Sequence, residues 1–182
     1  MAKFEEKTID SKDIYDGKIL KLRLDTVELP DGSSSKREIV EHSGGVAVVA
    51  VTDSGELLMV RQYRKAMEKE LLELPAGKLE AGEDPLECAE RELREETGYK
   101  AGSIELLSEF YTAPGFCSEK VYVYIAKELE FVGEALDEGE FLEVEKYRIE
   151  ELGSLLSELQ DAKSIIGVMH LMREKEVCSY GN

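Results

Sequence analysis

The chain has 182 residues, which is the usual size of a single domain. Hydrophobic residues make up 42% and charged residues 35%, a globular composition that excludes disordered and fibrous proteins. The 40 Asp and Glu residues outnumber the 23 Lys and Arg residues, and the formal net charge is −17. Because phosphate backbones and anionic lipids attract basic surfaces, we expect no nucleic-acid partner and no membrane association.

The three cysteines, Cys88, Cys117 and Cys178, have neither zinc-site spacing nor CxxC spacing. An odd number without such spacing favours free thiols in a reducing compartment. The N-terminus lacks the apolar stretch of a signal peptide, and the longest apolar run, residues 46–51, is far shorter than the ~20 residues of a membrane-spanning helix. We therefore expect a cytoplasmic protein.

The N-terminal region, residues 1–43, is predicted to consist of β-strands. Apolar residues alternate roughly over residues 19–29, and residues 30–35 (Pro-Asp-Gly-Ser-Ser-Ser) form a strong turn signal. Residues 37–42 are then expected to be the return strand of a hairpin. A region of this size cannot bury a core of its own.

Residues 44–182 are predicted to form a second, larger domain of strands and helices. Asp84 as N-cap, Pro85 in the first turn and Gly98 as the stop predict a central helix over residues 85–97. The expected strands are 46–51 (buried on both faces), 57–64, 104–112 and 120–131, and the expected further helices are 150–159 and 162–176. This pattern predicts an α/β or α+β sandwich.

Residues 77–99 are the most informative segment, with eight acidic and only three basic residues. Glu92 and Glu96 are four positions apart and share one helix face. Carboxylate oxygens are the ligands that a hard cation such as Mg²⁺ prefers. An acidic helix alone is more often a solvated surface, so the interpretation depends on the complete spacing of the segment.

That spacing fits the pattern G-x5-E-x7-R-E-U-x-E-E-x-G-U, in which U is a bulky apolar residue. The fixed positions are Gly77, Glu83, Arg91, Glu92, Glu95, Glu96 and Gly98. Tyr99 stands at the last U, where an aliphatic residue is usual. This pattern is the Nudix box, and the chain resembles Nudix hydrolases. The resemblance implies an α/β/α sandwich with a mixed sheet, preceded by a small antiparallel β region.

The resemblance also implies roles for individual residues. The residues that match metal ligands of the family are Ala76 (through its carbonyl), Glu92, Glu96 and Glu140. The residues that match catalytic positions are Arg91, which orients a box carboxylate, Glu95, which assists, and Glu138, the expected general base. The implied cofactor is Mg²⁺, with Mn²⁺ as a substitute. A solvated acidic loop is the alternative for Glu138 and Glu140.

Features outside the box resemble the ADP-ribose pyrophosphatase subfamily. Pro114 lies 15 residues after Tyr99, in a Thr-Ala-Pro-Gly loop of the kind found there. The residues that match substrate contacts of the subfamily are Arg37, Arg64, Glu73, Pro114, Gly115 and Glu119. The alternatives are ion-paired or solvated arginines and an ordinary turn at the end of a strand.

The resemblance therefore implies Mg²⁺-dependent hydrolysis of the diphosphate of ADP-ribose, giving AMP and ribose 5-phosphate. It implies a homodimer in which residues 1–43 form the interface and part of the substrate pocket. Another nucleotide sugar or a dinucleotide, such as GDP-mannose, ADP-glucose or NADH, remains an alternative substrate. An inactive module that binds ADP-ribose is the other alternative, although such modules usually lack the glutamates that stand here at positions 92, 95 and 96.

Overall fold

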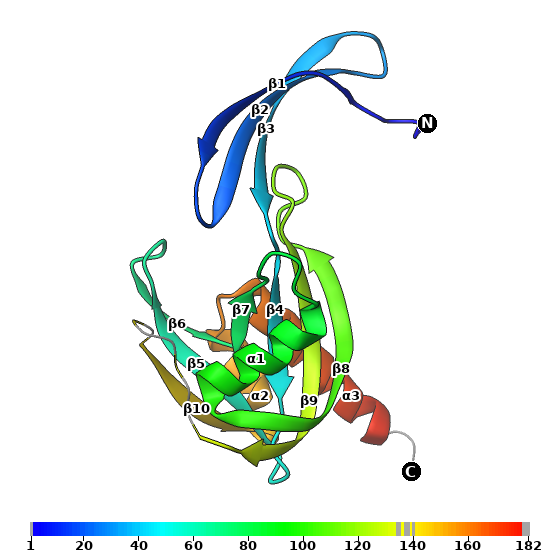
Figure 1. Cartoon of the computed structure of the whole chain (residues 1–182). Coiled ribbons are helices and arrows are strands. Elements are labelled where there is room, and N and C mark those ends of the chain that lie inside the picture. Colours follow the sequence, from blue (N-terminus) through cyan, green and yellow to red (C-terminus); the bar gives the residue numbers. More distant parts are fainter. Residues whose placement is uncertain (1, 134–135, 137–138, 140, 180–182) are drawn as a thin grey trace. The chain divides into compact units, whose positions relative to one another are not determined.

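A computed structural model of the chain describes residues 2–133, 136, 139 and 141–179 (Figure 1). The chain divides into two compact units. The N-terminal unit consists of Met1–Gly44 and Tyr111–Lys120, and the larger unit consists of Gly45–Phe110 and Val121–Asn182. The first boundary lies beside the one expected at residue 43, whereas the sequence did not indicate that residues 111–120 group with the N-terminal strands.

The N-terminal unit contains a three-stranded antiparallel sheet in the order β1-β2-β3. The strands are β1 (Lys7–Asp16), β2 (Leu20–Glu28) and β3 (Ser34–His42). Strands β2 and β3 form the expected hairpin, with Leu20 opposite His42 and Glu28 opposite Ser34. Strand β1 lies in the region predicted to consist of strands, but its bounds were not predicted, because its Lys, Asp and Ser residues have low β propensity.

The larger unit contains two sheets. One is mixed, in the order β7-β4-β9-β8, and comprises Ala76–Lys78, Gly45–Ala50, Lys120–Phe131 and Tyr99–Tyr111, respectively. Strand β4 pairs parallel with β9 and antiparallel with β7. The other sheet, in the order β10-β5-β6, comprises Leu142–Arg148, Glu56–Arg64 and Lys69–Glu73. Strands β6, β7 and β10 had no sequence prediction.

Helices cover both faces of the strands in this unit (Figure 1). They are α1 (Pro85–Thr97), a 3₁₀ turn (Ile149–Glu151), α2 (Leu152–Glu158) and α3 (Ala162–Ser179). Ala47 and Val49 of β4 belong to a core cluster with α2 and α3, whereas Val46 and Val48 belong to a cluster with α1. Because neighbouring strand residues point to opposite faces, β4 is the middle layer of an α/β/α sandwich. The predicted fold class is confirmed.

The central strand and the helices agree closely with their sequence predictions. All six residues of β4 are buried, as a strand between two helical layers requires. Helix α1 has the expected bounds, and α2 and α3 lie within or close to the expected ranges. Among the described residues, no helix combines the length and apolar character needed to cross a membrane.

Candidate active site on helix α1

Helix α1 is held in place by its caps and by its apolar side. The Asp84 carboxylate accepts a hydrogen bond from the Leu86 backbone N–H at 2.8 Å, and Gly98 ends the helix with φ = 75°. That left-handed conformation favours glycine. Cys88, Ala89 and Leu93 are buried against β4. Glu92 and Glu96 are buried on this same side of the helix, so its packing also fixes their orientation.

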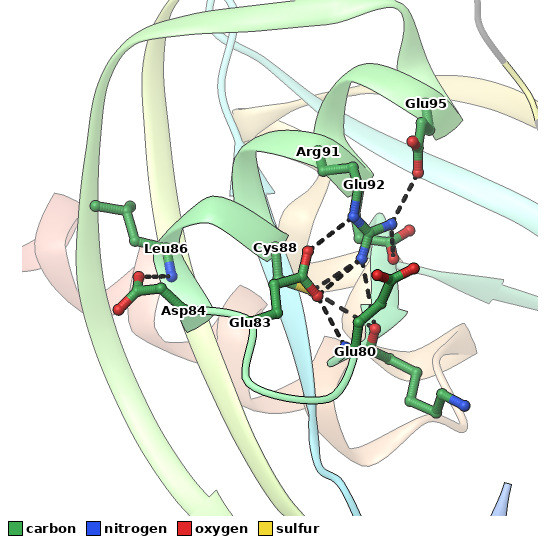
Figure 2. A network of polar contacts seen from close by, with 9 residues as sticks. Glu80, Glu83, Asp84, Leu86, Cys88, Arg91, Glu92 and Glu95 are labelled. Carbon is green, nitrogen blue, oxygen red and sulfur yellow. Dashed lines mark hydrogen bonds and ion pairs between the residues drawn. The ribbon is translucent and has the colours of Figure 1, made fainter.

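The guanidinium group of Arg91 lies at the centre of a carboxylate network (Figure 2). Its Nε donates to Glu83 at 2.9 Å, and its Nη1 donates to Glu92 at 2.7 Å and to Glu95 at 2.9 Å. The hydrogen bond from Arg91, aided by the Glu80 backbone N–H, lowers the pKa of Glu83 to about 2. The same carboxylates raise the pKa of Arg91. Three box carboxylates thus share one cation, which fixes their positions.

Glu92 and Glu96 face the segment that begins β7. Both are buried, with 9% and 5% of their surface exposed. The Ala76 N–H donates a hydrogen bond to Oε2 of Glu96 at 2.8 Å. A Cβ atom built on Gly77 would lie 1.8 Å from the carboxyl carbon of Glu92, so only glycine leaves room for this carboxylate. Both acids therefore lie beside residues 76–77.

These residues fit a divalent cation of the Mg²⁺ type. The donors are carboxylate oxygens one helical turn apart, and the missing side chain of Gly77 makes the space that the Glu92 carboxylate occupies. The described residues include no group of three or more His, Cys, Asp or Glu side chains arranged as a complete metal site. Mg²⁺ commonly binds through one or two carboxylates and completes its shell with water and substrate phosphates. Glu138 and Glu140, the other expected acids, lie outside the described residues.

Arg64 and Glu73, two expected substrate contacts, form an ion pair with each other across strands β5 and β6. Nε and Nη2 of Arg64 donate to the two carboxylate oxygens at 2.6 and 2.8 Å. Lys163 of α3 also donates to Oε2 of Glu73, which is only 2% exposed. Burial alone would raise the pKa of Glu73, but the Arg64 and Lys163 contacts outweigh it and lower that pKa. The expected substrate role of both residues stays a prediction.

The remaining expected substrate residues belong to the N-terminal unit. Arg37 of β3 donates to both oxygens of Glu6, at 2.8 and 2.6 Å. Glu119 accepts a hydrogen bond from the Thr112 hydroxyl at 2.7 Å. Pro114 and Gly115 lie in a loop joined to β3 by the hydrogen bond from the Val40 N–H to the Phe116 carbonyl, at 2.7 Å. The sequence left open that Arg37 is an ion-paired arginine, and the structure shows that pair with Glu6. The substrate role of Arg37 stays a prediction.

Three polar residues near the Arg64–Glu73 pair were missed by the sequence analysis. Lys163 and Ser164 belong to α3, about 90 residues away along the chain, and no local pattern indicates such a contact. The third is Gln62 of β5, two residues before Arg64 on the same strand face. Its buried Nε2 has no hydrogen-bond partner in the described part of the chain. The sequence could have indicated Gln62, because a residue two positions before Arg64 in a strand lies on the same face as Arg64.

Two family models match this chain along its length. The model described as nucleoside diphosphate sugar hydrolase N-terminal domain matches residues 6–40. The model described as NUDIX domain matches residues 41–167, which is more than half of the chain. The chain belongs to the Nudix family. The recognition based on the box at residues 77–99 is confirmed.

Curated relatives of this Nudix protein match nearly its full length. The ADP-ribose pyrophosphatase of Bacillus subtilis is 48% identical, over 94% of this chain and 95% of the relative. The methanol dehydrogenase activator of Bacillus methanolicus is 47% identical over the same shares. The ADP-ribose pyrophosphatase of Mycobacterium tuberculosis is 43% identical, over 93% and 84%. A solved ADP compounds hydrolase superposes with a TM-score of 0.84 at 22% identity, covering 100% of this chain and 98% of that one, and supports the fold.

Proposed function

We propose that this Nudix protein hydrolyses the diphosphate of ADP-ribose to AMP and ribose 5-phosphate, with Mg²⁺ as the metal. The observation that carries the proposal is the buried pair Glu92 and Glu96 beside the glycine that makes room for it. Two relatives that are 48% and 43% identical over more than nine-tenths of the chain are named ADP-ribose pyrophosphatase. Their names are the reason for choosing ADP-ribose as the proposed substrate.

The proposed reaction adds one water across the anhydride. The water oxygen forms a bond to phosphorus, and the bond from that phosphorus to the bridging oxygen breaks. One proton of the water goes to a base, for which Glu138 is our candidate, and the bridging oxygen leaves on the other phosphate. Bound Mg²⁺ would neutralise the diphosphate and lower the pKa of the attacking water. Arg91 holds Glu92 and Glu95 in position throughout.

Substrate binding is proposed for six further residues: Arg37, Arg64, Glu73, Pro114, Gly115 and Glu119. The best supported is Arg64, because its pair with Glu73 uses Nε and Nη2 and so orients the whole planar guanidinium group. A guanidinium oriented in this way is suited to a phosphate. The Glu73 carboxylate raises the pKa of Arg64, so this guanidinium stays positively charged.

We further propose a cytoplasmic homodimer whose interface includes the N-terminal sheet. Ile9, Ile14 and Tyr15 of β1 are exposed in the single chain, and a three-stranded sheet cannot bury them alone. Light scattering at working concentration should give twice the chain mass of 20.4 kDa. A mass of one chain would contradict the dimer.

A panel of nucleotide substrates tests the choice of ADP-ribose. The competitors in the panel are ADP-glucose, GDP-mannose and NADH. GDP-mannose is included because a GDP-mannose pyrophosphatase of Cronobacter sakazakii is 31% identical over 75% of this chain. We expect the highest kcat/KM for ADP-ribose. A higher kcat/KM for a competitor would support Nudix hydrolysis but contradict ADP-ribose as the preferred substrate. Binding of ADP-ribose without turnover of any compound would indicate a binding module.

A further inference from the structure

The first turn of helix α3 contacts the chain segment that leads into β7. Ser164 is fully buried, and its hydroxyl accepts a hydrogen bond from the Leu74 N–H at 2.8 Å. The same hydroxyl donates to Asp161 at 2.6 Å, and Asp161 also accepts from the Ser164 N–H at 3.0 Å. The helix cap and the contact to Leu74 therefore share one hydroxyl group.

Each residue from Glu73 to Gly77 is held by a different contact. Glu73 is bound by Arg64 and Lys163, and the Leu74 N–H is bound by Ser164. The Pro75 carbonyl accepts from the Val48 N–H at 2.8 Å. The Ala76 N–H donates to Glu96, and Gly77 lies against Glu92. The two ends of this segment therefore connect helix α3 to the two buried acids of helix α1.

Close packing makes this connection stiff. A Cβ atom on Gly167 of α3 would lie 2.6 Å from Cδ1 of Leu74 and 2.8 Å from Cγ2 of Val49. The helix therefore approaches the segment as closely as a glycine permits. A small shift of Leu74 would be passed along two peptide units to the Ala76 N–H and so to the Glu96 carboxylate.

We propose that Ser164 is a positioning residue for the metal site, acting through Leu74 on the Ala76 backbone and the Glu96 carboxylate. The proposal rests on divalent-metal binding as part of the proposed function, but not on the identity of the substrate. Residues that orient metal ligands indirectly typically change metal affinity 10–100-fold when they are removed. Ser164 acts one step further out, so the lower end of that range applies.

The test measures Mn²⁺ binding by the full-length, substrate-free protein, using electron paramagnetic resonance or calorimetry. We expect Ser164→Ala to weaken Mn²⁺ binding about tenfold. Val168→Ala is the matched control, because Val168 is fully buried in the same helix and loses core packing without touching the segment through a polar group. We expect this control to change Mn²⁺ affinity less than about twofold while lowering the urea midpoint.

A second readout separates positioning from loss of stability. Amide hydrogen exchange without metal should be at least about tenfold faster at Leu74 and Ala76 in Ser164→Ala than in Val168→Ala. If Ser164→Ala does not fold, Asp161→Asn keeps a helix cap while weakening both the acceptor of the Ser164 hydroxyl and the ion pair with Lys163. It should shift both readouts in the same direction.

Equal effects of Ser164→Ala and Val168→Ala, or unchanged Mn²⁺ binding in Ser164→Ala, would overturn the proposal. A wild-type protein that binds no Mn²⁺ without nucleotide would also overturn it, because Ser164 is proposed to position ligands that bind metal before the substrate arrives. No substrate enters these measurements. A failure to hydrolyse ADP-ribose would therefore count against the proposed function and leave the role of Ser164 intact.

Discussion

The backbone N–H of Ala76 donates a hydrogen bond to Oε2 of Glu96, with 2.8 Å between nitrogen and oxygen. The bond joins a residue of strand β7 to an acid in the last turn of helix α1. It fixes one oxygen of a carboxylate that is 5% exposed. The Ala76 carbonyl, an expected metal ligand, belongs to the same residue. The groups that we propose as metal ligands on the strand and on the helix are thus positioned together.

Glu96→Gln should abolish most of the activity without unfolding the protein. The amide keeps the size of the side chain but removes the negative charge that a divalent cation requires. We expect kcat to fall at least about 100-fold, the upper end of the range for residues that only support metal ligands. Steady-state kinetics measures the effect. Glu90→Gln, at an exposed position of the same helix, should retain full activity, and an equal loss there would refute the assignment.

Gly77→Ala should displace Glu92 and leave the fold intact. The added methyl group would lie 1.8 Å from the Glu92 carboxyl carbon, and this end of a flexible side chain can move away. We expect a loss of activity of about 10–100-fold with a nearly unchanged melting temperature. Gly153→Ala in α2 is the control, because its methyl group would meet no atom within 4 Å. Activity of Gly77→Ala near the wild-type level would show that the position of Glu92 is unimportant.

Glu83→Gln should destabilise the protein in a pH-dependent way. The folded-state pKa of Glu83 is about 2, below its ordinary value of 4.5, because Arg91 donates to the ionised carboxylate. Its contribution to stability is therefore complete above pH 4.5 and is lost as the pH falls toward 2. We expect the variant to lose about 1–2 kcal/mol of unfolding free energy at neutral pH.

Urea unfolding over a range of pH values checks the Glu83 prediction. The difference between wild type and Glu83→Gln should shrink on acidification below pH 4.5. A difference that stays constant down to the acid transition would mean that the Glu83 charge is not the cause. Glu90→Gln should show no such difference at any pH.

Lys163→Met should weaken substrate binding more than it slows chemistry. Lys163 shares the buried Glu73 carboxylate with Arg64 and also pairs with Asp161 at 2.9 Å, so Arg64 does not hold Glu73 alone. Without Lys163, Arg64 alone must neutralise Glu73. We expect KM for ADP-ribose to rise about tenfold, kcat to change less than about threefold, and stability to fall by about 1–3 kcal/mol. Lys163→Arg should restore KM, and a fall confined to kcat would contradict this role.

The sequence was most informative where the signals are local. Asp84, Pro85 and Gly98 predicted the bounds of helix α1, because caps and a left-handed stop act within one turn. The spacing of Gly77, Glu92 and Glu96 predicted which residues gather at the acidic helix. Strands were predicted for residues 1–43, but the bounds of β1 were not, because its Lys, Asp and Ser residues have low β propensity and its pairing with β2 is not a local signal.

Long-range polar contacts could not be predicted. Ser164 and Lys163 contact residues 90 positions earlier, and only the packing of α3 against the strands brings them there. Arg64 and Glu73 were both expected to bind substrate. In the β5–β6 pairing Glu73 lies opposite Val60 and Lys69 lies opposite Arg64, so the two side chains meet only because they reach toward each other along one strand face. Neither motif spacing nor the register alone predicts such a contact.

The most direct test of the proposed activity is product analysis after incubation of the purified protein with ADP-ribose and Mg²⁺. We expect AMP and ribose 5-phosphate in equal amounts from wild type, and neither product after addition of a chelator or with Glu96→Gln. Intact ADP-ribose with the wild-type protein, or product formation that survives both the chelator and Glu96→Gln, would contradict metal-dependent hydrolysis at the acidic residues of helix α1.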